Sequence, residues 1–336
     1  MAVKDEITLQ VDGRDVRLSH PGKVVFPRQG WTKAHVADHY QACAEGALRG
    51  IFGRPTVLKR WPDGAEGQPF FQKRAPKPKE GPTHEYATVR FPSGRSADLL
   101  VPRHPADILW MVQLDCIDLN PWPVRAEEVD LPDELRLDLD PGPDVPFATV
   151  RRVASVCRDV LEEHGLVGWP KTSGSRGMHV CVRIEARWPF TEVRRAALAL
   201  AREVERRVPS LATSAWWKEQ RHGVFIDYNQ NARDRTVASA YSVRPTGFVS
   251  APLRWDEVPD MEIADFPLDT FARQRYAAVG DLTAGMDEVP GDLERLLDLA
   301  ARDAREGLGD APWPPHFPKQ SGEPPRVQPS RRRQGG

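Results

Sequence analysis

The chain has 336 residues, 40% of them hydrophobic, which is enough to bury a core in one large domain or two smaller ones. A formal net charge of −1 excludes a globally basic protein, so any binding to nucleic acid must come from local patches. The four cysteines lack CxxC spacing and no apolar run approaches the ~20 residues of a membrane span, which argues against a zinc module, a disulfide framework and a membrane protein.

The N-terminal third of the chain predicts one helix and several short strands. Thr32 is a favourable N-cap, and the apolar residues that follow it recur at helical spacing up to Leu48. Short strands are expected at 57–62 and 70–74, where cations and aromatic residues are interleaved. Residues 108–117 are strongly apolar without a clear period, so strand and helix both stay open there.

A strand is expected next, at residues 135–140. The leucines at positions 135, 137 and 139 share one face, while Arg136, Asp138 and Asp140 share the other. The two carboxylates would then stand side by side, where like charges repel unless a cation neutralises them. The pair therefore suits a divalent metal, and the alternative is a solvated polar face on an ordinary edge strand.

The later elements alternate between helix and strand. Helical spacing predicts helices over 146–164, 191–208 and 293–306, and strands are expected at 178–184 and 224–228. This order indicates an α/β or α+β catalytic unit. The last segment, 309–336, is rich in proline and arginine without apolar periodicity, which predicts a flexible basic tail.

A third carboxylate, Asp227, lies near the end of the strand at 224–228. Three carboxylates carried by strands suit phosphoryl transfer with two metal ions, in which one ion activates an attacking hydroxyl and the other neutralises the triphosphate. A capping or salt-bridging role for Asp227 is the alternative.

The loop at 171–179 has a composition suited to phosphate. Its two glycines let backbone amides approach an anion, and its hydroxyls and cations add donors and charge. It lacks the GxxxxGK[ST] spacing of a P-loop, and a strand follows it in place of a helix. The alternative for this loop is a simple flexible turn.

These motifs stand in a recognisable order. They are Asp138-X-Asp140, Ser173-Gly-Ser-Arg-Gly-Met-His179 and Phe225-Ile226-Asp227. The set resembles the archaeo-eukaryotic primase superfamily and, more closely, the polymerase domain of bacterial ligase D, which acts in non-homologous end joining. The likeness extends from about Leu18 to Val258. It includes Lys23-Val-Val-Phe-Pro27, Thr32-Lys33, Phe70-Phe71-Gln72-Lys73, Asn120-Pro-Trp122 and Arg244-Pro245.

The resemblance implies an α+β fold with an RRM-like antiparallel sheet flanked by helices. An N-terminal α/β part, about residues 1–130, would form the other wall of the cleft, and residues 131–308 the catalytic part. Together these make one expected domain, 1–308, followed by the tail at 309–336.

The resemblance also implies a role for each matching side chain. Asp138, Asp140 and Asp227 would bind two metal ions, with Mn²⁺ favoured over Mg²⁺. The residues implied to hold the nucleotide triphosphate are Ser173, Arg176, His179 and Arg244, together with Lys59.

Two further pairs are implied to contact DNA. Lys23 and Lys33 would bind the 5′-phosphate at a break, and the residues alone would equally suit a solvated surface. Phe70 and Phe71 would stack on template bases, an interaction worth ~1–3 kcal/mol per base. From the residues alone, ordinary core is the favoured interpretation of this aromatic pair.

One position departs from the family pattern. The family often has histidine where this chain has Asn120, and that histidine is associated with the nucleotide sugar. Asparagine hydrogen-bonds a hydroxyl but carries no charge. The family tendency is to prefer ribonucleotides, and Asn120 is the residue on which that preference would depend.

We therefore expect a repair polymerase that adds NTPs or dNTPs to DNA 3′ ends by gap filling and end extension. Its expected partners are gapped or broken DNA with a 5′-phosphate, Ku, and a separate ATP-dependent DNA ligase, because the 336 residues leave no room for the ligase domain of ligase D. A cytoplasmic, nucleoid-associated monomer is the simplest expectation. The alternatives are a primase that starts chains de novo and a non-catalytic module that bridges DNA ends.

Overall fold

The structure, a computed structural model, describes residues 5–77, 84–320 and 323–326. Its strands are β1 (Glu6–Val11), β2 (Arg14–Ser19), β3 (Val24–Phe26), β4 (Trp31–Thr32), β5 (Thr56–Arg60), β6 (Phe70–Gln72), β7 (Glu85–Arg90), β8 (Ser96–Val101), β9 (Asn120–Pro121), β10 (Glu134–Pro141), β11 (Trp169–Thr172), β12 (Met178–Arg183), β13 (Ala212–Thr213) and β14 (Val224–Ile226). Its α-helices are α1 (Lys33–Ala42), α2 (Ala44–Arg49), α3 (Pro105–Gln113), α4 (Phe147–Glu163), α5 (Phe190–Arg207), α6 (Leu268–Phe271), α7 (Ala277–Val279) and α8 (Glu294–Arg305), and the short helical segments are η1 (Lys218–Gln220), η2 (Tyr228–Asn231), η3 (Ile263–Asp265) and η4 (Ala272–Tyr276).

The catalytic sheet has the strand order β11-β12-β10-β14-β13. Its pairs are antiparallel except β13 with β14. β10 lies in the middle of the sheet, so the edge-strand interpretation of its acidic face is wrong. The leucines at 135, 137 and 139 are fully buried, and α4 and α5 pack against this strand.

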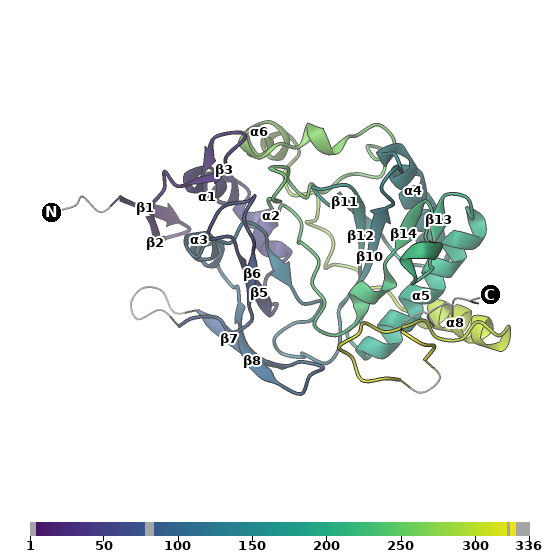
Figure 1. The fold of residues 1–336 in the computed structure, drawn as a ribbon. Coiled ribbons are helices and arrows are strands. Elements are labelled where there is room, and N and C mark those ends of the chain that lie inside the picture. The colour runs from purple at the N-terminus through teal and green to yellow at the C-terminus, as the bar shows by residue number, and fades with distance from the viewer. Residues whose placement is uncertain (1–4, 78–83, 321–322, 327–336) are drawn as a thin grey trace, which may run out of the picture.

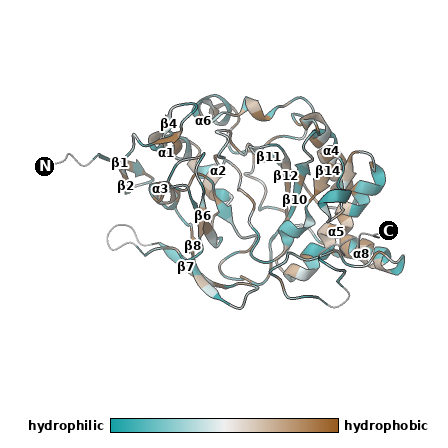
Figure 2. Ribbon diagram, viewed as in Figure 1, coloured by the Kyte–Doolittle hydropathy of each residue, from teal (hydrophilic) through white to brown (hydrophobic). Residues whose placement is uncertain are grey.

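Figure 1 shows α4 and α5 on the side of the catalytic sheet that faces away from the N-terminal part. In Figure 2, hydrophobic and hydrophilic residues alternate along α5 and α8, as expected of helices that cover a core with one face. The opposite, polar face of the sheet therefore looks toward the N-terminal part. This arrangement is the α+β architecture that the sequence predicted.

The N-terminal part is built on a second sheet with the order β6-β5-β8-β7, and β9 pairs with β5. The open question about residues 108–117 is settled in favour of helix, since α3 covers most of this segment. Pro105 stands at the first turn of α3, and the side chain of His104 accepts a hydrogen bond from the amide of Ala106. These two features start the helix.

The other predicted elements agree with the structure, with local differences. The helix expected from Thr32 to Leu48 divides into α1 and α2 at Cys43, and Thr32 caps it as predicted. The helices expected at 146–164, 191–208 and 293–306 are confirmed as α4, α5 and α8. All four cysteines are free, as expected, and Cys181 alone is only half-buried.

The prediction of a flexible tail over 309–336 is wrong for the part that the structure describes. Trp313 and Phe317 are 4% and 8% exposed, and they form a small apolar cluster with Ala232. A proline-rich segment that forms neither a helix nor a strand has no periodic apolar pattern. A few anchor residues hold it against the domain instead. Residues 327–336, with the arginine run, lie outside the described residues.

The anchor for this segment is Arg194 of α5, which is 1% exposed. Its guanidinium lies 2.7 Å from a carboxylate oxygen of Asp310 and donates to the carbonyls of Ala311 and Pro312. The indole ring of Trp313 covers the same guanidinium, with its centroid 4.1 Å away. We call residues 309–320 the C-terminal strap.

In the described parts of the chain, no helix has the length and apolar character that crossing a membrane requires.

Candidate active site

Three carboxylates meet at one end of the catalytic sheet. Asp138 and Asp140 lie on the polar face of β10, and Asp227 directly follows the neighbouring strand β14. The amide of Asp227 donates to the carbonyl of Asp138 over 2.8 Å, which ties the two strands together here. Within the described residues, one ligand atom from each carboxylate lies within 4.8 Å of the other two. This set of hard oxygen donors fits a divalent cation.

Burial disfavours the charged form of all three carboxylates, and the charge of Asp138 adds to this effect at Asp140 and Asp227. Burial raises the pKa of Asp138 to about 6, against the attraction of two nearby cations. The pKa of Asp140 rises to about 6 through burial and then through the charge of Asp138. The same causes raise the pKa of Asp227 to about 6, although it accepts two hydrogen bonds from η2. A bound divalent cation would relieve this repulsion.

His179 lies opposite Asp138 in the register of β10 and β12. Its Nε2 is 3.2 Å from a carboxylate oxygen of Asp138, and its Nδ1 is 2.6 Å from Nζ of Lys171. Burial, followed by the charge of Lys171, holds the pKa of His179 well below its usual value. The imidazole is therefore neutral at neutral pH and presents one donor and one acceptor.

Residues 173–177 form the turn between β11 and β12. The hydroxyl of Ser173 accepts hydrogen bonds from two amides of the turn, over 3.0 and 3.2 Å. Gly174 has a φ of +66°, and a Cβ on Gly177 would lie 2.2 Å from the carbonyl oxygen of Leu139 in β10. Glycine is required because the turn contacts the strand that carries the carboxylates. This packing argues against the flexible-turn interpretation.

The two predicted arginines, Arg176 and Arg244, lower the pKa of carboxyl groups in this site through their charge. Arg244 attracts the charge of Asp138, and its Nε is buried without a hydrogen-bond partner among the described residues. Arg176 is exposed on the turn and attracts the charge of Asp140. A buried, unpartnered guanidinium nitrogen beside a polar site is a feature that a bound anion would satisfy.

Asn120 and Lys59 belong to the N-terminal wall. Asn120 is 5% exposed on β9, and β9 adjoins the catalytic sheet because Arg136 of β10 donates to the carbonyl of Pro121. Lys59 pairs with Asp118 over 3.2 Å and has no recorded contact with the carboxylate cluster. The structure thus places Asn120 on a strand that adjoins the catalytic sheet, with its amide donating to the carbonyl of Asp118, and leaves Lys59 farther along the same wall.

The two phenylalanines of β6 are exposed, so the core interpretation of this pair is wrong. Phe70 is 45% exposed and Phe71 is 55% exposed. The guanidinium of Arg60 lies 5.3 Å from the ring centroid of Phe70, and the ammonium of Lys59 lies 5.7 Å from that of Phe71. Exposed aromatic faces flanked by cations are typical of surfaces on which bases stack.

Lys23 and Lys33 come together through Asp115. Their ammonium nitrogens lie 3.0 and 3.4 Å from the same carboxylate oxygen. Lys33 is only 4% exposed, and burial lowers its pKa. Two cations that share one carboxylate keep a net positive charge, as a phosphate site requires, and the solvated-surface interpretation is wrong for Lys33.

The comparisons with known proteins point in the same direction. A sequence model of the LigD primase-polymerase domain matches residues 32–283, which is more than half of the chain. The chain belongs to the LigD primase-polymerase domain family. Metal dependence is a property of this family, and the cluster on β10 and β14 supplies the carboxylates.

Individual LigD proteins are similar over most of this chain. The multifunctional non-homologous end joining protein LigD of Mycolicibacterium smegmatis is 32% identical over 320 residues, covering 90% of this chain and 40% of that protein. LigD of Pseudomonas aeruginosa is 32% identical over 253 residues, covering 74% of this chain and 30% of that protein. The chain therefore spans less than half the length of these relatives.

A solved structure of a LigD polymerase domain has the same fold. The polymerase domain of Mycobacterium tuberculosis ligase D in complex with DNA matches with a TM-score of 0.75 and 31% identity, covering 82% of this chain and 99% of that one. The primase-type fold expected from the motifs is thereby confirmed.

Sequence reasoning missed three residues that shape this LigD-type site. Gln230 donates to Asp227, Asp115 gathers the two lysines, and Lys171 contacts His179. Lys171 was counted only as one of the cations of the loop at 171–179, whereas the structure places it in the strand before the turn. Gln230 and Asp115 carried no signal, because their roles depend on contacts made across the fold.

Proposed function

We propose that this chain is a metal-dependent nucleotidyltransferase that extends DNA 3′ ends during end joining. The observation that carries the proposal is the convergence of Asp138, Asp140 and Asp227 beside a turn of fixed geometry and a neutral imidazole. Membership of the LigD primase-polymerase domain family supports it. A protein that only binds DNA would gain no affinity from a cluster of carboxylates, because their negative charges repel one another and the DNA phosphates.

The chemistry divides between metal and protein. Two divalent cations, Mn²⁺ in preference to Mg²⁺, would be held by the three aspartates and would supply charge neutralisation and activation of the attacking 3′-hydroxyl. The protein would position the triphosphate through the hydroxyl of Ser173, which the turn amides hold in place, and through the guanidinium groups of Arg176 and Arg244. His179 adds one neutral donor. Since phosphoryl transfer is mainly an electrostatic problem, these fixed donors are the protein's main contribution.

DNA would lie along the N-terminal wall. The similar LigD polymerase domain from Mycobacterium tuberculosis was solved in complex with DNA. In this chain, exposed Phe70 and Phe71 offer a stacking surface, and Lys59 beside Phe71 adds a cation for the nucleic acid. The pair of Lys23 and Lys33 would bind the 5′-phosphate on the far side of a gap.

Sugar choice would depend on Asn120. Its amide is buried on β9, next to the catalytic sheet, and it hydrogen-bonds a 2′-hydroxyl in our proposal. We propose a preference for ribonucleotides because that is the tendency of the family. We also propose that Ku and an ATP-dependent DNA ligase act with this chain in the cytoplasm at the nucleoid, because the similar LigD proteins are named for non-homologous end joining.

One experiment separates this function from a primase and from a bridging module. Nucleotide incorporation is measured with Mn²⁺ on a primed, gapped duplex with a downstream 5′-phosphate and on an unprimed template. Binding to DNA ends is measured separately. The proposal predicts incorporation on the gapped duplex that is lost in Asp138→Ala. Products on the unprimed template would support the primase, and end binding without incorporation would support the bridging module.

A further inference from the structure

Lys171 is a buried cation beside the proposed active site, on the same face of the catalytic sheet as His179 and Asp138. It lies on β11, is 4% exposed, and pairs with His179 in the register of β11 and β12. Its ammonium lies within 2.7 Å of three acceptors, which are Nδ1 of His179, the carbonyl of Ala238 and the hydroxyl of Ser250. An ammonium has three protons, so each acceptor accounts for one of them.

The protons in this network have one consistent arrangement. The hydroxyl of Ser250 lies 2.7 Å from the carbonyl of Thr172. A carbonyl only accepts, so the single hydroxyl proton goes to Thr172 and the hydroxyl oxygen accepts from Lys171. The ammonium then donates to Nδ1 of His179, which leaves the imidazole proton on Nε2.

We propose that Lys171 is a positioning residue that holds His179 as the Nε2–H tautomer, so that its single ring proton points into the active site, toward Asp138 in this structure and toward the triphosphate in the proposed function. The inference rests on the role of His179 in the proposed function. Nε2 already lies 3.2 Å from a carboxylate oxygen of Asp138, which only accepts when ionised. In the other tautomer, a ring proton would point at the ammonium and a lone pair at the carboxylate, and both contacts would be repulsive.

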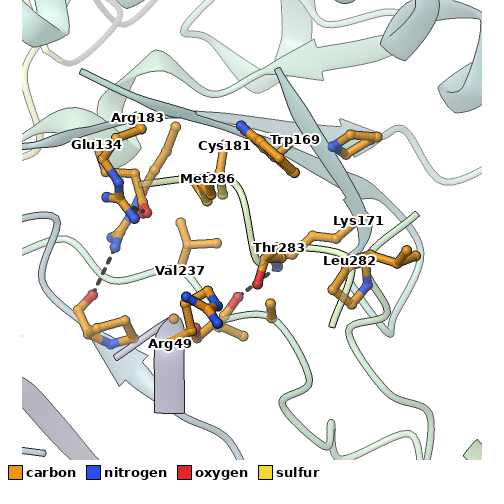
Figure 3. Close-up of a pocket in the computed structure, with 18 of the residues that line it drawn as sticks. Arg49, Glu134, Trp169, Lys171, Cys181, Arg183, Val237, Leu282, Thr283 and Met286 are labelled. Atoms are coloured by element: carbon orange, nitrogen blue, oxygen red, sulfur yellow. Dashed lines mark hydrogen bonds and ion pairs between the residues drawn. The ribbon is translucent and has the colours of Figure 1, made fainter. Parts of the chain in front are cut away.

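The surroundings of Lys171 support a role beyond packing. Among the described residues, no carboxylate lies within ion-pair distance of its ammonium, and burial lowers its pKa to about 8. The lysine is therefore still mainly charged at neutral pH, although a buried cation without a paired carboxylate is costly. Its stem borders a cavity of about 40 Å³ on the same face of the sheet, which is walled by Trp169, Leu282 and Met286 (Figure 3).

The cavity determines the best substitution. Lys171→Met keeps most of the side-chain length and removes the three donors, whereas Lys171→Ala would enlarge the cavity and disturb packing. Ser250→Ala is the matched control. It removes one acceptor of the same ammonium and leaves the contact between Lys171 and His179 in place.

The primary measurement is the tautomer of His179 by nitrogen-15 NMR of protein labelled at histidine. The chain has nine histidines, and the signal that disappears in His179→Gln identifies residue 179. We expect the Nε2–H pattern in the wild type and in Ser250→Ala. We expect the Nδ1–H pattern or a mixture in Lys171→Met.

Kinetics test the consequence of this positioning. Lys171→Met should lower kcat/KM for the nucleotide roughly 10- to 100-fold, the range for losing a residue that orients a functional side chain, with DNA binding unchanged within about twofold. A glutamine amide donates without help from Lys171, so in a His179→Gln background the same substitution should have a much smaller effect.

The outcomes separate the two proposals. An unchanged Nε2–H pattern in Lys171→Met overturns the positioning role, whatever the activity. Loss of the pattern in both Lys171→Met and Ser250→Ala also overturns it, because the effect would then be general damage to the network. If His179→Ala leaves kcat/KM for the nucleotide unchanged, the assignment of His179 in the proposed function fails, while the NMR result still decides what Lys171 does.

Discussion

Replacing Asp138 by asparagine should make the metal-free protein more stable while it destroys the proposed activity. The pKa of Asp138 rises from its ordinary 3.8 to about 6, and its side chain is 14% exposed. A pKa difference of that size corresponds to roughly 3 kcal/mol of disfavoured ionisation. Its charge also raises the pKa of Asp140 and Asp227. Asparagine removes that charge and still accepts a hydrogen bond from His179.

The sign of the pH dependence follows from the direction of the shift. A carboxyl whose pKa is higher in the folded state favours folding at low pH, and this contribution is lost as the pH rises through about 6. Above pH 7 the repulsion in the metal-free cluster is complete. We therefore expect Asp138→Asn to gain about 1–3 kcal/mol at pH 7.5, or roughly 1–4 °C in Tm, and to gain less at pH 5.

Thermal unfolding with a chelator and with Mn²⁺ measures this effect. Mn²⁺ should raise the Tm of the wild type at pH 7.5 and raise that of Asp138→Asn much less, since the variant lacks one ligand. Asp256→Asn is a suitable control, because its side chain is 80% exposed and outside the cluster. A metal-free Asp138→Asn that melts at or below the wild-type Tm at pH 7.5 would refute the reasoning about repulsion.

Three further predictions concern the DNA, the sugar and the strap. Lys23→Ala with Lys33→Ala should weaken binding to gaps with a 5′-phosphate roughly tenfold or more, measured by fluorescence anisotropy, and an equal loss on 5′-hydroxyl gaps would disprove the phosphate role. Asn120→Ala should lower the ratio of kcat/KM for NTPs to that for dNTPs about five- to tenfold, and an unchanged ratio would remove Asn120 from sugar selection. Trp313→Ala should cost about 3 kcal/mol of the free energy of unfolding by denaturant, because the ring is 4% exposed and covers Arg194; an unchanged value would mean that the C-terminal strap does not stabilise the domain.

The parts of the fold that depend on local pattern were predictable from the sequence. The alternation of leucines and acidic residues in β10 reports which face is buried, because side chains alternate along a strand. The arginine-rich α5 was equally clear, since its apolar residues recur at helical spacing. The strand positions suggested Asp138, Asp140 and Asp227 as one set, the resemblance supported it, and the structure brings their ligand atoms within 4.8 Å.

The features that sequence reasoning missed depend on distant contacts. Phe70 and Phe71 read as core from their residue types alone, and only the resemblance implied stacking, because exposure depends on whether another element covers β6; none of the described elements covers it completely. The strap has no periodicity, and its order depends on Arg194, more than 100 positions earlier in the chain. The proposed role of Lys171 depends on the pairing of β11 with β12, which places its side chain against His179.

The central claim is that the three aspartates form the metal site of a polymerase. The most direct test measures single-nucleotide incorporation with Mn²⁺ on a gapped, 5′-phosphorylated duplex for Asp138→Ala, Asp140→Ala and Asp227→Ala, with DNA binding measured in parallel. The account predicts that each variant binds the duplex and that none incorporates a nucleotide. Incorporation at the wild-type rate by any one of the three would contradict it.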